Sequence, residues 1–171
     1  MEKCSIPLTS LLGRTLIDSA YFKDAYCTSL NRPDTRMTAI FFSIFGHHPW
    51  WMNKALIARN RLASLAGLEV ATAAEVTHIE VKDNYKVGEK IGRWPIFYLT
   101  DTELVAGRDD KHLDFRLSLI KVWNGDEASV VVSTVCSVHN VFGKIYLFFI
   151  IPFHKSGIQL LIKNAVTAGR L

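Results

Sequence analysis

The sequence predicts an α+β fold in which an antiparallel sheet packs against a long C-terminal helix. Apolar residues recur with a helical period between Met37 and Leu65, and roughly every second residue is apolar from Leu68 to Val138. The helical period returns after Asn140. Short polar turns separate the candidate strands, as in sheets whose consecutive strands pair antiparallel. These three observations place two helices first, then a meander, then one long helix.

The chain has 171 residues, of which 49% are hydrophobic and 21% are charged. A chain of this length forms one domain that buries about 70% of the surface exposed on unfolding. Its hydrophobic content excludes intrinsic disorder. We therefore expect a single domain over residues 1–171, with an N-terminal extension at 1–19 and a core at 20–168.

The first part of the core predicts one strand and two helices. Residues 21–30 alternate as a strand does. Asp34 is expected to cap a helix that ends at Gly46, and Pro49 suits the first turn of a second helix that ends at Gly67. The buried stripe of this second helix comprises Trp51, Ala55, Ala58, Leu62 and Leu65.

The second part predicts the sheet and the long helix. The candidate strands are Glu75–Val81, Ile91–Thr100, Thr102–Ala106, Lys111–Trp123 and Ala128–Val138. The helix is expected from Val141 to about Ala168, with Asn140 as its N-cap and a kink or break at Pro152. Beyond the proline, one face of this helix carries His154, Ile158, Leu161 and Ala165. His154 is therefore expected to point inward.

Composition argues against several classes of protein. The net charge is +4, but lysine and arginine are mixed with acidic residues, so no nucleic-acid partner is expected. Cys4, Cys27 and Cys136 are far apart in sequence, which indicates reduced thiols and a cytoplasmic location. The N-terminus does not resemble a signal peptide. The most apolar run, Val141–Phe153, is interrupted by Pro152 and is shorter than the roughly 20 residues of a transmembrane span, so no span is expected.

Two stretches, Gly107–Arg116 and His139–His154, resemble segments of the bacterial family called domain of unknown function 2867. The element order resembles the helix-grip fold of the START-like superfamily. In that fold a curved antiparallel sheet wraps around a long C-terminal helix over a cavity, and two small helices close one end. The resemblance covers about Ala20 to Ala165. It implies an apolar ligand in the cavity and supplies no catalytic residues.

One face of the strand Lys111–Trp123 is polar and carries His112, Asp114, Arg116 and Ser118. This face can be the solvated side of the sheet, or it can form a polar end of the cavity. Alternatively, His112 and Asp114 form half of a metal or acid–base site with Asp109 or Asp110. A metal needs a further convergent ligand that the sequence does not identify, so no metal is expected.

These observations predict a protein that holds a small apolar molecule between the sheet and the C-terminal helix, without a cofactor. His154 is the expected polar anchor, although it can instead be a core histidine bonded to a backbone carbonyl. Trp50 is a candidate lid at the cavity mouth. The expected cavity walls are Phe97, Leu113, Phe115, Leu117, Phe149, Phe153 and Ile158.

Two other functions remain open from the sequence. The first is a cofactor-free cyclase, lyase or hydrolase that uses His154 or His112 as acid and base, which requires two or more titratable groups to converge. Cys136 near His154 is expected to be a small buried apolar residue rather than a nucleophile. The second is docking onto a partner protein or a membrane surface through Val141–Phe153, which requires that segment to be exposed. A homo-oligomer is compatible with each of these functions.

Overall fold

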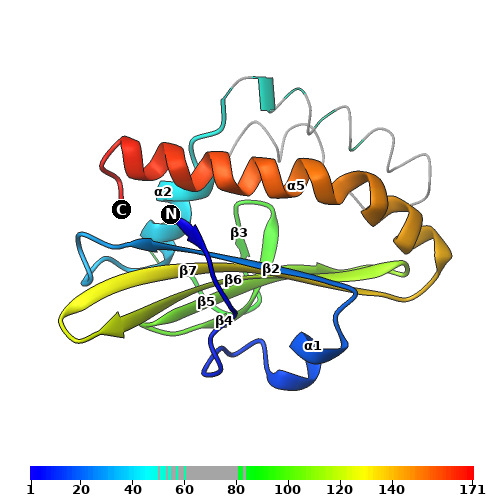
Figure 1. Ribbon diagram of the computed structural model, residues 1–171, viewed down its shortest axis with the longest axis horizontal. Helices are drawn as coiled ribbons and strands as arrows, with labels where there is room; N and C mark the ends of the chain where they lie inside the picture. Colours follow the sequence, from blue (N-terminus) through cyan, green and yellow to red (C-terminus); the bar gives the residue numbers. More distant parts are fainter. Residues whose placement is uncertain (50, 53, 55–56, 58–59, 61–80, 83) are drawn as a thin grey trace.

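The computed structural model describes residues 1–49, 51–52, 54, 57, 60, 81–82 and 84–171 (Figure 1). Its strands are β1 (Glu2–Lys3), β2 (Phe22–Ser29), β3 (Lys90–Ile91), β4 (Trp94–Leu99), β5 (Glu103–Asp109), β6 (Leu113–Asn124) and β7 (Glu127–Val138). Its helices are α1 (Arg14–Ser19), α2 (Met37–Phe45) and α5 (Val141–Thr167). The helix expected from Pro49 to Gly67 and the strand Glu75–Val81 lie largely outside the described residues.

The described strands form a seven-stranded sheet in the order β1-β2-β7-β6-β5-β4-β3, and every neighbouring pair is antiparallel. The sheet is open, with β1 and β3 at its two edges. Phe22 of β2 lies opposite Cys136 of β7, which lies opposite Phe115 of β6. The predicted α+β class, with an antiparallel sheet and a long C-terminal helix, is confirmed.

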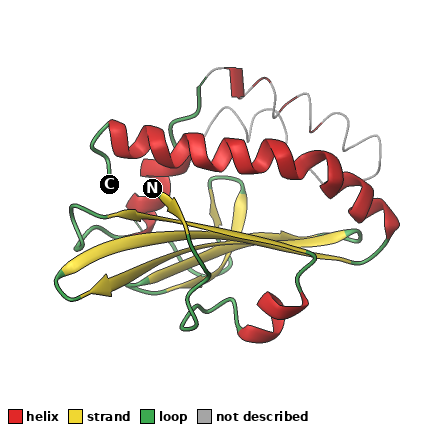
Figure 2. Ribbon diagram, in the orientation of Figure 1, coloured by secondary structure: helices red, strands yellow, loops and turns green. Residues whose placement is uncertain are grey.

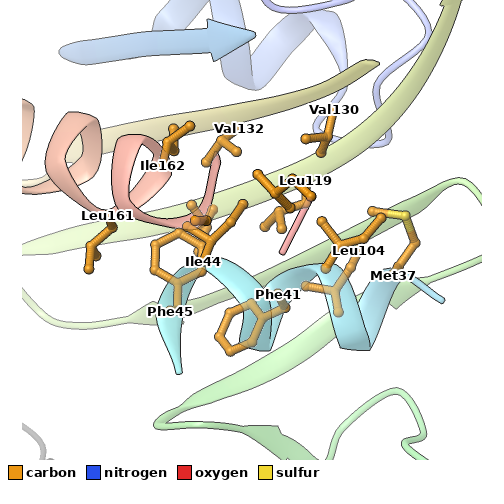
Figure 3. Packing of buried hydrophobic residues seen from close by; sticks show 14 of the residues in the cluster. Met37, Phe41, Ile44, Phe45, Leu104, Leu119, Val130, Val132, Leu161 and Ile162 are labelled. Carbon is orange, nitrogen blue, oxygen red and sulfur yellow. The ribbon is translucent and has the colours of Figure 1, made fainter. Parts of the chain in front are cut away.

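The main apolar core lies between one face of the sheet and the helices α2 and α5. In Figure 3, Phe41 and Ile44 of α2 and Ile162 of α5 lie beside Leu119 and Val132 of the sheet. Each of these side chains is at most 1% exposed. Burying a side chain of this size contributes about 1.5–3 kcal/mol, so this cluster fixes the C-terminal half of α5 on the sheet.

The N-terminal segment packs on the opposite face of the sheet, where Figure 2 shows α1 on the far side from α5. Ser10 Oγ and Ser118 Oγ both donate hydrogen bonds to Oε1 of Glu103, at 2.7 and 2.6 Å, and Leu11 N donates to Oε2 at 2.7 Å. Ser118 is 0% exposed. The polar face of β6 is therefore covered at Ser118, and the expectation of a fully solvated face is wrong there.

The sequence did not predict the elements of the N-terminal extension. β1 adds an edge strand beside β2, and α1 covers apolar residues of the outer face. The expected strand Ile91–Thr100 is also two strands, β3 and β4, joined by a tight turn at Gly92. The φ of Gly92 is 59°, a conformation that glycine adopts without the penalty of a Cβ.

The helix ends follow the expectations in part. The side chain of Asn140 accepts a hydrogen bond from Gly143 N at 3.1 Å, so the predicted N-cap of α5 is confirmed. α5 continues through Pro152, and the helix is not broken there. The N-cap of α2 is Arg36, with no side-chain cap, so Asp34 does not have the predicted role.

Candidate functional site

Strand β2 brings a carboxyl group into the interface between the sheet and α5. Because side chains alternate along a strand, Phe22, Asp24 and Tyr26 share the face that carries the main core. Asp24 is 6% exposed. A buried carboxyl group is costly unless hydrogen bonds or an opposite charge compensate it, so its surroundings are informative.

His154 of α5 faces Asp24 across this interface. His154 Nε2 lies 3.5 Å from Asp24 Oδ1, which is long for a hydrogen bond. Within the described part of the chain, neither carboxyl oxygen of Asp24 nor Nε2 of His154 has a hydrogen-bond partner. The ring of Phe22 stands edge-on to the imidazole, with 5.7 Å between centroids. The pair thus retains hydrogen-bonding capacity in an apolar setting.

Tyr26 extends the polar cluster by one step along β2. Its hydroxyl accepts a hydrogen bond from Gln159 Nε2 at 3.1 Å. Burial raises the pKa of the Tyr26 hydroxyl, and the hydrogen bond from Gln159 opposes this rise. The charge of Asp24 and the polar contact of its carboxyl group with the hydroxyl add to the rise, although the two groups do not meet in hydrogen-bonding geometry. Tyr26 therefore stays a neutral hydroxyl at physiological pH.

Cys136 lies on β7 directly opposite Phe22 and is 5% exposed. Burial raises the pKa of its thiol to about 12, and the charge of Asp24 adds to this rise. Because the thiolate is the reactive form, a thiol with this pKa is not a nucleophile at neutral pH. This agrees with the expected role of Cys136 as a small buried residue.

The Asp24–His154 pair, defined by these two side chains, can bind a donor and an acceptor on one small group. A carboxylate accepts hydrogen bonds at both oxygens, and an imidazole nitrogen donates or accepts according to its protonation. A histidine beside a carboxyl group is also an arrangement used for proton transfer. The geometry is compatible with ligand recognition and with acid–base chemistry.

A family profile described as "Protein of unknown function (DUF2867)" matches residues 16–159, most of the chain. The protein belongs to the DUF2867 family. No curated protein and no solved structure matches the chain. The family match spans Asp24 and His154 and covers both stretches on which the resemblance was based.

In this DUF2867 protein, several of the predicted cavity residues lie on the inner face. His154 points toward the sheet, with 20% of its side chain exposed. Ile158 and Leu117 are buried in the main core, and Phe115 packs against it. Leu113 shares the face of Phe115 two residues away on β6 and is half-buried. The predicted inward orientation of His154 is confirmed, whereas its role toward a ligand stays a prediction.

Three other predicted wall residues of the DUF2867 protein lie elsewhere. Phe97 packs on the outer face of the sheet with Val105 and Val135, and the Arg116 guanidinium lies 3.7 Å from its ring centroid. Phe149 and Phe153 are 63% and 77% exposed. Their expected position between the sheet and α5 is therefore wrong. Trp50 lies outside the described residues.

The alternative in which His112 and Asp114 form part of one site is wrong, because the two side chains have different partners. His112 Nδ1 lies 3.1 Å from Asn140 Oδ1, and Asp114 Oδ1 lies 3.0 Å from His139 Nε2. Arg116 pairs with Asp109. These contacts join β6 to the start of α5 and to the end of β5, which is a structural role.

Sequence reasoning missed Asp24, Tyr26 and Gln159. The available signal for Asp24 was the alternation of β2, which sets one acidic side chain between two aromatic ones on the buried face. Gln159 lies beyond Ile158 in α5 and gave no such signal, because its contact with Tyr26 joins residues far apart in sequence.

The outward side of α5 carries exposed apolar side chains along its first half. This α5 outer stripe comprises Val141, Phe142, Ile145, Phe148, Phe149 and Phe153, each at least 53% exposed. By length and composition α5 is sufficient to cross a membrane, and 22% of its most apolar window is buried in the protein. The core helix of a soluble protein can have the same length and composition. The exposure that the docking hypothesis requires is present.

Proposed function

We propose that this DUF2867 protein binds a small apolar molecule that carries a hydroxyl group, between the sheet and the first half of α5. The observation that carries the proposal is the buried carboxyl group of Asp24, which has no hydrogen-bond partner in the described residues and faces His154. Leaving such a group unsatisfied costs about 1–3 kcal/mol, and a bound donor removes this cost. We assign the arrangement to the helix-grip type of the START-like superfamily.

The chemistry of the pair selects the polar group of the ligand. A hydroxyl can donate to Asp24 and accept from His154 with one oxygen atom. A fatty-acid carboxylate would place a second acidic group beside Asp24, where two like charges repel or must share a proton. The site therefore favours an alcohol over a carboxylate with the same apolar body.

Apolar side chains around the pair provide the rest of the binding surface. Phe22 stands against His154, and Phe115 lies across Cys136 from Phe22. Leu147 is 4% exposed and precedes His154 by two turns on the same side of α5. Each buried CH₂ group of a ligand contributes about 0.8 kcal/mol. The affinity for a ligand should therefore rise with the length of its apolar body. The Asp24–His154 pair should determine which polar head group is preferred.

The test compares decanol with decanoate, which share one chain and differ at the head. Calorimetry should detect decanol binding to the wild type and at least about tenfold weaker binding of decanoate, equivalent to about 1.4 kcal/mol. Asp24→Asn should weaken decanol binding and reduce the discrimination between the two. Asp18→Asn, an exposed acid on α1, is the matched control and should bind as the wild type does. Tighter binding of decanoate than of decanol would exclude this proposal, as would the absence of both.

Acid–base catalysis is a second candidate because titratable groups converge at the site. Asp24, His154 and Tyr26 meet at the interface between β2 and α5. Native mass spectrometry of purified protein should identify a bound molecule, which is then incubated with the wild type and with His154→Gln. Conversion by the wild type alone would favour an enzyme. Binding without conversion would favour a binding protein.

A further inference from the structure

The α5 outer stripe forms a ridge of large apolar side chains in solvent. From Phe142 to Phe153 it runs for about three turns, roughly 16 Å at the helical rise of 1.5 Å per residue. Phe148 and Phe153 are 72% and 77% exposed. Contiguous exposed apolar surface of this kind marks a site of interaction, whereas apolar side chains exposed singly do not.

The charges around the stripe specify its partner. The sequence has no aspartate or glutamate from Ala128 to Leu171, and its cations there are Lys144, Lys155, Lys163 and Arg170. Lys144 and Lys155 are exposed on the same helix turns as the stripe, and Lys111 is exposed before its N-terminal end.

The acidic residues near the start of α5 already have partners. Asp110 accepts a hydrogen bond from His112 N at 3.0 Å, and Asp114 lies 3.0 Å from His139 Nε2. Lys155 Nζ also lies 5.7 Å from the ring centroid of Phe22, at the edge of the helix, and its side chain is exposed. An apolar ridge flanked by exposed lysines is complementary to an anionic lipid surface.

The packing of the second half of α5 limits how much of the helix can enter a lipid bilayer. Ile158, Leu161, Ile162 and Ala165 are at most 8% exposed and pack in the main core. A bilayer-spanning α5 would have to leave this core and lose its packing on the sheet. The fold therefore supports a helix that lies in the interface plane, with only its first half immersed.

We propose that the protein docks peripherally on an anionic membrane surface through the α5 outer stripe, with Lys144 and Lys155 contacting lipid head groups. This goes beyond ligand binding and does not depend on it, because the stripe and the Asp24–His154 pair lie on opposite sides of the helix. The inner side of α5 meets the sheet, and the outer side meets the bilayer.

Vesicle sedimentation tests the proposal with the full chain. The wild type should sediment with vesicles of phosphatidylcholine mixed with phosphatidylglycerol, and more weakly with phosphatidylcholine alone. High salt should reduce binding to the mixed vesicles, because it screens the lysines. Alkaline carbonate should release the protein, as expected of a peripheral protein and not of a spanning one.

Substitutions separate the apolar and the charged contributions. Phe149→Ser with Phe153→Ser should reduce binding at least about tenfold, since each exposed ring loses its burial in lipid. Lys144→Gln and Lys155→Gln should each weaken binding to the mixed vesicles about fivefold and leave binding to phosphatidylcholine unchanged. Trp123→Ser removes an aromatic side chain that is 51% exposed at the far end of β6, and it should bind as the wild type does. Circular dichroism should show a native fold for each variant.

The alternative occupant of the stripe is a second copy of the chain. The proposal would be overturned in favour of self-association by two results together. The wild type would not bind vesicles, and it would form a dimer that dissociates when Phe149→Ser and Phe153→Ser are introduced. Equal binding to neutral and anionic vesicles would overturn the assigned role of the lysines. Resistance to carbonate extraction would overturn peripheral docking.

Discussion

His154 on α5 directs its Nε2 at Oδ1 of Asp24 on β2, with 3.5 Å between the two atoms. The aspartate side chain is 3% exposed and the histidine side chain 20%. Water can therefore hydrate the imidazole in part, whereas the carboxyl group has the imidazole as its nearest polar neighbour on α5. The pair also spans the interface at which α5 meets the edge of the main core. Removing either partner therefore changes both the stability of the fold and the chemistry of the site.

A double-mutant cycle should show that the two side chains are coupled. His154→Leu removes the polar group nearest to the buried Asp24 carboxyl group and should lower the free energy of unfolding by about 1–3 kcal/mol. Adding Asp24→Val removes the buried carboxyl group, so the double variant should recover most of the unfolding free energy that His154→Leu loses. Urea denaturation of the four proteins gives the coupling energy.

Arg14 and Asp18 provide the control pair. Their charged atoms lie 3.9 Å apart on α1, and both side chains are more than 60% exposed, at 64% and 66%. An exposed pair of this type contributes about 0.3–0.5 kcal/mol. A coupling between Asp24 and His154 as small as this control would show that the buried pair is only a geometric neighbour.

The sequence predicts the inward position of the His154 side chain because the second half of α5 has polar residues on one side. The first half has no such contrast. Phe149 and Phe153 belong to a run that is apolar all around the helix, so its period does not indicate which side meets the sheet. Only the packing of α5 on a distant part of the chain decides the orientation.

Two further differences, at Phe97 and in the N-terminal segment, have separate causes. Trp94 and Ile96 of β4 pack in the main core, so alternation along the strand sets Phe97 on the outer face of the sheet. The sequence predicts no helix or strand in the N-terminal extension, because the residue that anchors this segment, Glu103, is far along the chain. Order that depends on such long-range contacts leaves little periodic signal in the segment itself.

The carboxylate of Glu103 should be a measurable anchor for the N-terminal segment. Ser118→Ala removes one donor and leaves Glu103, which is 2% exposed, with fewer hydrogen bonds. The expected loss is about 1–3 kcal/mol in the free energy of unfolding. Ser10→Ala should in addition speed proteolysis within 1–19, because it removes one of the two hydrogen bonds that join the segment to Glu103.

Ser19→Ala is the control for this anchor, since its Oγ bonds only within exposed α1, at 2.8 Å from Thr15 O. Its stability and proteolysis should match the wild type. Unchanged proteolysis of Ser10→Ala would show that apolar packing alone holds the segment on the sheet.

Two glycines of α5 should respond in opposite ways to alanine. A Cβ at Gly143 would lie 2.4 Å from the backbone oxygen of His112, so Gly143→Ala should destabilise the protein by about 1–3 kcal/mol. Among the described residues, a Cβ at Gly157 would meet only Met52 Cε, at 4.0 Å. Gly157→Ala should therefore stabilise the helix by about 0.5–1 kcal/mol. Thermal unfolding of both variants measures the contrast, and equal shifts would contradict the close approach of α5 to His112.

Acid should destabilise the protein through His48. Burial lowers the pKa of this imidazole from 6.5 to about 4, and the charges of Arg93 and His47 add to the effect. Between these two pKa values the unfolded chain binds a proton that the folded protein does not. The free energy of unfolding should therefore fall as the pH decreases from 6.5 to 4, by about 1–2 kcal/mol for an imidazole that solvent partly screens.

His48→Gln removes this titration and keeps a polar side chain at the position. The free energy of unfolding of His48→Gln should decline less than that of the wild type between pH 6.5 and 4. Above pH 6.5 the side chain at position 48 is neutral in both proteins, so the two curves of unfolding free energy against pH should differ there by a constant. Urea denaturation across the window measures both curves, and subtracting them removes the contribution of every other titrating group. Parallel curves between pH 6.5 and 4 would mean that water reaches the imidazole in the folded protein and that burial does not hold it neutral.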